Sequence, residues 1–381
     1  MTHNTSLDNR IQQLYRQSEY ELDACALPNG ALVAANSDLH IYPSTAENYR
    51  FSWARDAAYQ LLAAHAVAPE KARDRTIQYA KWLHNVQNFS ASGLYIKRYG
   101  TNGALDVRYG EQWQPDQAGA LIGSFDTIIP EQNHHIDIAI QKMANALSDR
   151  WDGQSFGPTQ DLWENRETST VNGDVFTYTL ASAIYGLEHA ITRFENTDVD
   201  TSVWRQAQGE MKQKIAAVPT HYYARKTYPD SNQPDPDNSL DSSLAGLVYP
   251  FTIEEPQTES TIHAIHDQLY RPGLGVYRYV GDTYDGIVRE KSQEATAGAW
   301  PLLTFWEAIS LHALGQKVRS KDIFYDTIER LDREYKSGLL PDNIIPEQIY
   351  PDDERQGKGV LPLAWSHAKF ILAAKALQLV E

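Results

Sequence analysis

The helical segments of this chain are joined by connections that alternate between short and long. Apolar residues recur at i, i+3, i+4 and i+7 in about twelve segments, most clearly in Thr177–Ile191. The long connections are Asp23–Ala54, Asn88–Pro115, Arg150–Gly173, Pro219–Asn238, Tyr270–Gln293 and Lys336–Pro362. Long loops within compact domains are uncommon and usually functional. Helix pairs with every long loop at one end predict an all-α fold, an (α/α)6 barrel of about twelve helices whose long loops form the active-site face.

The sequence also predicts where each helix begins. Their starts lie near Asn9, Arg55, Arg73, Asp116, Glu131, Asp174, Thr201, Ser239, Glu259, Glu294, Ser320 and Leu363. An open helical solenoid is the alternative, although the chain lacks the strict repeat typical of solenoids. The most linker-like stretch, Asp230–Asp237, falls inside the fourth long loop. Residues 1–381 are therefore expected to form a single domain.

Charge and hydropathy narrow the class of partner. The formal net charge is −16, and Lys and Arg are scattered, which argues against a nucleic acid or an anionic membrane as partner. No apolar run reaches the roughly 18 residues of a membrane span, and Met1–Arg10 lacks the apolar core of a secretory signal. A cytoplasmic protein is expected, although a chain whose signal had been removed would look the same.

Several kinds of chemistry have no motif here. Phosphate-binding glycine loops and the G-x-S-x-G nucleophile elbow are absent. His134 and His135 are adjacent, so on a helix their side chains point about 100° apart and make a poor metal pair, and Cys25 is the only cysteine. No metal or organic cofactor is expected. The 22 Tyr against 10 Phe instead suit a sugar, which offers both apolar faces and hydroxyls.

The third long loop holds the strongest catalytic candidate. In Asp161-Leu162-Trp163-Glu164 a carboxyl group stands beside an indole, which can exclude water and disfavour the ionised form. A general acid for glycosidic cleavage needs that property at neutral pH. A solvated loop glutamate is the plainer interpretation. Arg166 would favour the ionised form of Glu164, so we expect it to point elsewhere.

The first and sixth long loops add further candidates. Arg55 and Asp56 offer a donor fork and an acceptor to one sugar ring, and Tyr49 could stack on its apolar face. Alternatively, Asp56 complements the start of a helix and Arg55 pairs with it. Glu347 follows an apolar Ile-Ile-Pro run, which points either to a catalytic carboxylate or to a structural ion pair.

The second and fifth long loops contribute aromatic residues and a donor. Trp113 could line a pocket or cover the core. Arg278 stands between two tyrosines, of which Tyr279 is one, and Trp300 follows further on. Arg278 is either a donor to sugar hydroxyls or a surface residue in a small hairpin.

These segments, in this order, resemble glycoside hydrolase family 15, the family of glucoamylases, glucodextranases and isomaltose-type glucohydrolases. The resemblance runs from about Gly30 to Lys375 and lies in Tyr49-x-Phe51-x-Trp53-x-Arg55-Asp56, Trp113-Gln114-Pro115, Asp161–Glu164, Arg278-Tyr279-x-x-Asp282-x-Tyr284 with Trp300, and Glu347-Gln348 with Leu363-x-Trp365-Ser366. It implies that Glu164 is the catalytic acid and Glu347 the catalytic base. The substrate-binding residues that it implies are Tyr49, Trp53, Arg55, Asp56, Trp113, Trp163, Asn165, Arg278, Tyr279 and Trp300.

Two departures from the family pattern bear on the substrate. An acidic residue usually follows the catalytic acid, and Asn165 stands there, so the linkage and leaving-group preference are open. The motifs begin near residue 30, without the N-terminal β-sandwich domain usual in bacterial members. Single-domain relatives tend to act on short oligosaccharides.

The resemblance therefore implies an inverting exo-acting α-glucosidase. It would release β-D-glucose from the non-reducing end of short α-gluco-oligosaccharides, α-1,6-linked such as isomaltose or α-1,4-linked such as maltose. A water must fit between the two carboxyl groups, which should then lie roughly 6.5–9.5 Å apart. The alternatives are a non-catalytic regulatory or sugar-binding (α/α)6 domain and a trehalase-type hydrolase.

Overall fold

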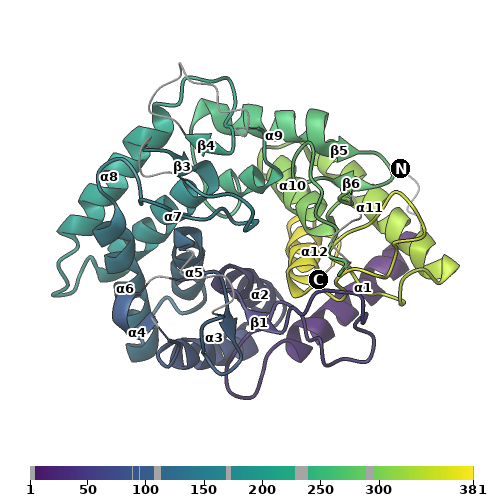
Figure 1. The fold of residues 1–381 in the computed structure, drawn as a ribbon, viewed down its shortest axis with the longest axis horizontal. Coiled ribbons are helices and arrows are strands. Elements are labelled where there is room, and N and C mark those ends of the chain that lie inside the picture. Colours follow the sequence, from purple (N-terminus) through teal and green to yellow (C-terminus); the bar gives the residue numbers. More distant parts are fainter. Residues whose placement is uncertain are drawn as a thin grey trace.

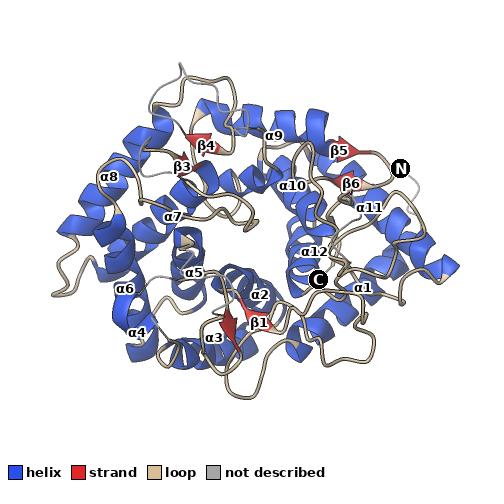
Figure 2. Cartoon of the chain, viewed as in Figure 1, coloured by secondary structure: helices blue, strands red, loops and turns tan. Residues whose placement is uncertain are grey.

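The helices form two concentric rings (Figures 1 and 2). The computed structural model describes residues 5–87, 89–93, 95–106, 113–168, 173–227, 239–288 and 296–380. The inner ring contains α2 (Ala54–Val67), α5 (Pro115–Ile128), α7 (Thr177–Phe194), the 3-10 helix η2 (Ser242–Leu247), α10 (Pro301–Ala313) and α12 (Ala364–Ala376). The outer ring contains α1 (Thr5–Ala24), α3 (Pro69–Leu83), α6 (His134–Arg150), α8 (Ser202–Ala216), α9 (Pro256–Leu269) and α11 (Lys317–Ser337).

The inner ring closes on itself. Each inner helix packs against the next one along the chain, and α12 packs against α2. Closure distinguishes a barrel from an open solenoid, so the predicted (α/α)6 barrel is confirmed.

The distribution of apolar residues explains which helices lie inside. Nearly every residue of α5 and α10 is buried, as expected for a helix surrounded by other elements on all sides. The outer helix α11 buries only one stripe, which includes Ile323, Phe324, Ile328 and Leu331. The inner helices are therefore buried on all sides, whereas the amphipathic outer helices are buried on one face.

The helix expected near Ser239 is shorter than its periodicity suggests. It is only the 3-10 helix Ser242–Leu247, which starts where the Asp241 side chain accepts from Ser243 N at 2.9 Å. Pro250 follows closely and has no N–H with which to continue a helix. The start expected near Glu294 and the stretch Asp230–Asp237 lie outside the described residues.

Short antiparallel strand pairs lie within or beside the long loops. These pairs are β1 (Phe51–Ser52) with β2 (Tyr99–Gly100), β3 (Val175–Phe176) with β4 (Lys226–Thr227), and β5 (Tyr270–Arg271) with β6 (Gly275–Val276). A short helix, α4 (Phe89–Ser92), lies in the second long loop. None of the described helices is long and apolar enough to cross a membrane.

Candidate active site

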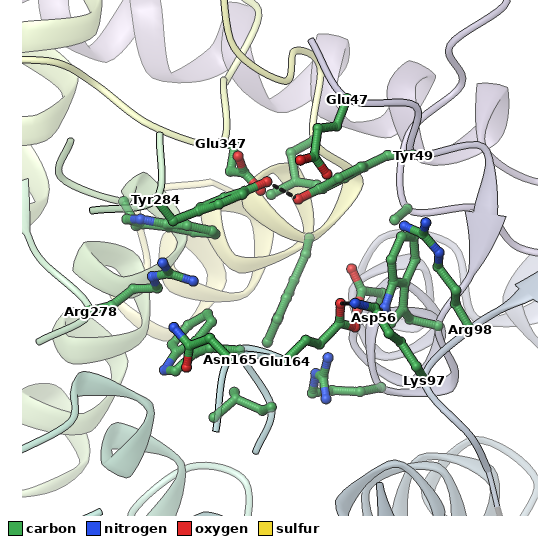
Figure 3. A pocket seen from close by; sticks show the side chains of 18 residues that line it. Glu47, Tyr49, Asp56, Lys97, Arg98, Glu164, Asn165, Arg278, Tyr284 and Glu347 are labelled. Atoms are coloured by element: carbon green, nitrogen blue, oxygen red, sulfur yellow. Dashed lines mark hydrogen bonds and ion pairs between the residues drawn. The ribbon is translucent and has the colours of Figure 1, made fainter. Parts of the chain in front are cut away.

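A pocket of about 280 Å³ opens among the long loops (Figure 3). This volume lies at the lower end of the range usual for ligand sites, so it suits little more than one sugar ring. The predicted site residues that line it are Tyr49, Trp53, Arg55, Asp56, Trp163, Glu164, Asn165, Arg278, Trp300 and Glu347. Segments far apart in the sequence therefore meet at one cavity.

Two predicted site residues do not line the pocket. The Trp113 ring lies under the Arg150 guanidinium, 4.3 Å from its centroid, and its backbone carbonyl accepts from Gln160 N at 2.8 Å. The Tyr279 hydroxyl accepts a hydrogen bond from Asn165 Nδ2. Trp113 thus belongs to the support of the third loop, and Tyr279 stands behind Asn165.

The turn that presents Glu164 is built by Asp161. The Asp161 carboxylate accepts from Asn165 N at 3.0 Å and from Arg166 N at 3.3 Å, an arrangement that favours a tight turn. Within this turn Glu164 has a φ of 64°, the left-handed region that residues other than glycine rarely adopt. Such backbone strain persists where surrounding contacts impose it and is concentrated at functional sites.

The carboxyl group of Glu164 contacts charged and polar groups rather than the neighbouring indole. The Trp163 N–H donates to Asp241 at 3.0 Å. The N–H that reaches Glu164 Oε1 comes from Trp53, and Lys97 Nζ lies 2.7 Å from Oε2. The Trp163 N–H is thus engaged with Asp241, and the groups that bind the Glu164 carboxyl group are the Trp53 N–H and Lys97.

Arg166 points where the sequence analysis expected, away from Glu164. Its Nη1 donates to Asn165 Oδ1 at 2.9 Å, and its guanidinium lies 4.5 Å from the Tyr279 ring centroid. The cation beside Glu164 is Lys97, which lies in the second long loop.

Gln117 holds two walls of the pocket together. Its Oε1 accepts from Ala54 N at 2.6 Å, at the start of α2. Its Nε2 donates to the carbonyls of Ile96 and Lys97 at 3.3 and 3.1 Å. One amide on α5 thus fixes the Lys97 segment relative to the helix that carries Arg55.

Arg55 and Asp56 both face the pocket but do not form the simple pair of the alternative interpretation. Arg55 Nη1 donates to Asp116 Oδ2 at 2.8 Å, and both side chains are almost fully buried. Burial raises the pKa of Asp56 to about 7, with a further contribution from the charge of Glu164, while Arg55 acts in the opposite direction. Asp56 is therefore poised to accept or donate to a sugar hydroxyl near neutral pH.

Arg278 is buried rather than exposed in a hairpin. It makes a bidentate ion pair with Asp282, at 2.7 Å from Nε and 2.6 Å from Nη2. Its guanidinium also lies 4.9 Å from the ring centroids of Tyr284 and Trp300. A planar donor fixed in this way is pre-organised for hydroxyl recognition.

The loop that carries Glu347 is fixed from both sides. Glu347 N donates to Val360 O at 2.8 Å, and the Ser366 hydroxyl donates to Pro346 O at 3.0 Å. His367 Nε2 accepts from Ile345 N at 3.1 Å. Burial lowers the pKa of His367 to about 3, so its ring is neutral and able to accept.

Glu347 lies in a well-shielded part of the pocket. It is 2% exposed, and burial raises its pKa to about 8, against hydrogen bonds from Tyr49 and Gln348 and the charge of Arg278. No described cation forms an ion pair with it, so the structural-pairing alternative is not supported. Its carboxyl group and that of Glu164 lie on opposite walls of the cavity (Figure 3).

Several buried donors and acceptors of the pocket are unused. Trp300 Nε1, Trp365 Nε1, Arg55 Nε and Glu347 Oε2 have no hydrogen-bond partner among the described residues. Buried polar atoms are normally satisfied, so unused ones in a pocket point to a ligand rich in hydroxyl groups.

The sequence analysis did not include all of the lining residues. The additional ones are Ala34, Glu47, Lys97, Arg98, Leu162, Tyr284, Leu363 and Trp365. Tyr284 and Trp365 stand in motifs already recognised, and their aromatic character could have identified them. Lys97, Arg98 and Glu47 have no local pattern, because the pairing of loops brings them to the pocket.

Comparison with known proteins supports a family assignment. The family model described as "Glycosyl hydrolases family 15" matches residues 11–375. An uncharacterized glycosyl hydrolase of Methanocaldococcus jannaschii is 25% identical over 96% of this chain and 56% of its own length. A trehalase of Mycolicibacterium smegmatis is 24% identical over 91% of this chain and 52% of its own. The chain thus spans about half the length of these relatives.

Solved structures show the same fold. A wild-type glycosidase aligns over 100% of both chains with a TM-score of 0.75 at 18% identity. The glucoamylase from Saccharomycopsis fibuligera aligns over 98% of this chain and 95% of its own, with a TM-score of 0.72 at 14% identity.

Proposed function

Because the chain belongs to the glycosyl hydrolases of family 15, we propose that it is an inverting exo-acting α-glucosidase. It releases β-D-glucose from the non-reducing end of short α-glucosides such as isomaltose and maltose. The observation that carries this proposal is the pair of carboxyl groups, Glu164 and Glu347, on opposite walls of one small pocket. An acid and a base on opposite faces of a sugar ring are what inversion requires.

The exposure of the two carboxyl groups supports their roles. In a pocket closed at one end, the non-reducing ring occupies the closed end and the leaving group lies toward the opening. The side chain of Glu164 is 16% exposed and is placed to protonate the leaving oxygen. Glu347, 2% exposed, lies deeper and removes a proton from the attacking water. Glucose is held by Arg55, Asp56 and Arg278.

The two carboxyl groups have different neighbours. Lys97 Nζ lies 2.7 Å from Glu164 Oε2, whereas burial favours the protonated form of Glu347. We infer that the leaving-group sugar displaces Lys97 from Glu164 when it binds. Electrostatic arrangement at such a site supplies much of the rate enhancement.

An activated leaving group distinguishes the two roles. Fluoride needs no proton from a general acid, so Glu164→Gln should hydrolyse α-glucosyl fluoride at a rate within about tenfold of the unaltered enzyme while losing about 10³-fold on maltose or isomaltose. Glu347→Gln should fail on both substrates, because water still needs a base. Rescue of Glu347→Gln alone would reverse the roles.

A trehalase-type activity is the second candidate. The observation that favours it is the similarity to a mycobacterial trehalase along 91% of this chain. Glucose release from trehalose, maltose and isomaltose at equal concentration separates the two. Release from trehalose alone would replace the first proposal, and release from none would favour a non-catalytic sugar-binding barrel.

A further inference from the structure

Glu47 lines the pocket together with Asp56, Glu164 and Glu347, and it is the acidic residue that the proposed reaction does not use. It lines the same cavity as Glu164 and Glu347 and is half-buried. Its side chain points toward the hydroxyl ends of Tyr49 and Tyr284, which lie beside Glu347 (Figure 3). A carboxylate in this place faces the base rather than the leaving group.

Contacts between the first and fifth long loops fix Glu47 beside Glu347. Ala46 and Ile287 form an antiparallel bridge, and Glu47 N donates to Gly286 O at 3.4 Å. A Cβ atom at Gly286 would lie only 2.5 Å from Glu347 Oε2. Gly286 therefore lies between the two glutamates, and the backbone position of Glu47 follows from the pairing of these loops.

The groups that face Glu347 come from two loops. Some titratable or charged groups change the pKa of Glu347, and for others the charge of Glu347 changes their own pKa. These groups are Tyr42, Glu47, Tyr49, Arg278 and Tyr284. Burial raises the pKa of Tyr49 and Tyr284 well above the usual value, so both stay protonated. A protonated tyrosine hydroxyl can pass on a proton only by accepting a second proton while it releases the first. The hydroxyls of Tyr49 and Tyr284 are hydrogen-bonded to each other.

We propose that Glu47 exchanges protons with Glu347 through the hydroxyls of Tyr49 and Tyr284 and so returns the base to its ionised form after each turnover. The inference rests on the proposed hydrolysis, in which one water proton ends on Glu347 and the proton of Glu164 leaves with the alcohol product. When Glu347 returns to its ionised form, it gives its proton to a tyrosine hydroxyl. The hydroxyl pair releases a proton to Glu47, and Glu47 releases that proton to solvent. Glu164 then takes one proton from solvent, so protons and charge balance.

The first test is the pH profile of kcat/KM with maltose or isomaltose, whichever the enzyme cleaves. Glu47 adds to the raised pKa of Glu347, after burial, because like charges disfavour ionisation. In Glu47→Gln that charge is gone, so the acid limb of the profile should move to lower pH by about one unit. Glu354→Gln, an exposed carboxylate of the sixth loop, is the matched control and should keep the original limb.

The second test measures proton release. In weakly buffered solution, Glu47→Gln should show kcat lowered about tenfold with KM unchanged, and added formate should restore kcat by carrying the proton instead. An acid limb identical to that of the unaltered enzyme, or a kcat that neither falls nor responds to formate, would overturn the proposal. If the unaltered enzyme releases no glucose from any disaccharide, the proposed function fails instead, so the two failures are distinct.

Discussion

The two walls of the pocket that carry Glu164 and Glu347 give these carboxyl groups different surroundings. On one wall, Glu164 is held by the Trp53 N–H and by Lys97 Nζ at 2.7 Å, so its charge is compensated. On the other, Glu347 is almost fully buried and its pKa rises to about 8. The difference shows that the same residue type meets a cation on one wall and desolvation on the other, so the two carboxyl groups depend on different parts of the fold.

Among changes that leave both catalytic glutamates in place, the largest expected effect comes from disturbing the buried wall. Gly286 has a φ of 66°, and a Cβ there would lie 2.5 Å from Glu347 Oε2. Gly286→Ala should therefore displace the base and lower kcat about 10²-fold, as misplacement of a reacting group by about 1 Å does. Steady-state kinetics on the preferred disaccharide measure this loss.

Gly157→Ala is the control for backbone strain in that experiment. Gly157 has a φ of 74°, and a Cβ there meets nothing within 4 Å. Both substitutions strain the backbone, but only one crowds a carboxyl group. Equal kcat values for the two variants would mean that the close approach of Gly286 to Glu347 has no catalytic consequence.

A smaller effect is expected on the charged wall. In Lys97→Met the cation 2.7 Å from Glu164 Oε2 is removed while the length of the side chain is kept, so the Glu164 carboxyl group loses a contact that positions it. kcat/KM on the preferred disaccharide should fall, by less than in Gly286→Ala, while Lys358→Met, at an exposed lysine, should not change it. An unchanged kcat/KM in Lys97→Met would show that Lys97 does not position the acid.

The smallest effect is on stability, and the two walls should respond in opposite directions. The pKa of Glu347 is raised from its ordinary 4.5 to about 8. The protonated carboxyl group therefore stabilises the folded state. This contribution is complete at pH values below the pKa that Glu347 has in the unfolded chain, and it is lost as the pH rises through its pKa in the folded protein. At pH 9, Glu347→Gln should melt a few degrees higher than the unaltered protein, and at pH 4 the two should coincide.

Glu164→Gln serves as the comparison in the same melting experiment. It removes the carboxylate 2.7 Å from Lys97 Nζ, and breaking a shielded ion pair destabilises. Its melting temperature should be lower than that of the unaltered protein at pH 9. A rise for both variants would contradict the difference between the walls.

The sequence predicted the barrel and most of the pocket because those features have local causes. Helical periodicity and the lengths of the connections indicate ring order, and short motifs mark where five of the six long loops meet the barrel. The helix expected near Ser239 was predicted to be too long. Its apolar spacing continues toward Pro250, but an α-helix cannot continue there because proline has no N–H to donate. Periodicity alone does not show that the segment forms only a 3-10 helix.

The parts that could not be predicted depend on side-chain direction and on contacts between loops. Trp163 and Glu164 are neighbours in sequence, at a turn where Glu164 has a φ of 64°, but the Trp163 N–H binds Asp241 and the Glu164 carboxyl group binds Trp53. Lys97 reaches Glu164 because Gln117 binds its carbonyl at 3.1 Å. Glu47 reaches the base through the pairing of Ala46 with Ile287. None of these relations has a sequence period or motif.

The most direct test of the account is the configuration of the first product. A water activated by Glu347 attacks the face of the anomeric carbon opposite to the bond whose oxygen Glu164 protonates, so an α-linkage must yield β-glucose. Proton NMR of a fresh digest of maltose or isomaltose, read before mutarotation, should show the β-anomer first. Appearance of the α-anomer first would mean retention and would contradict the assignment of an acid and a base separated by a water.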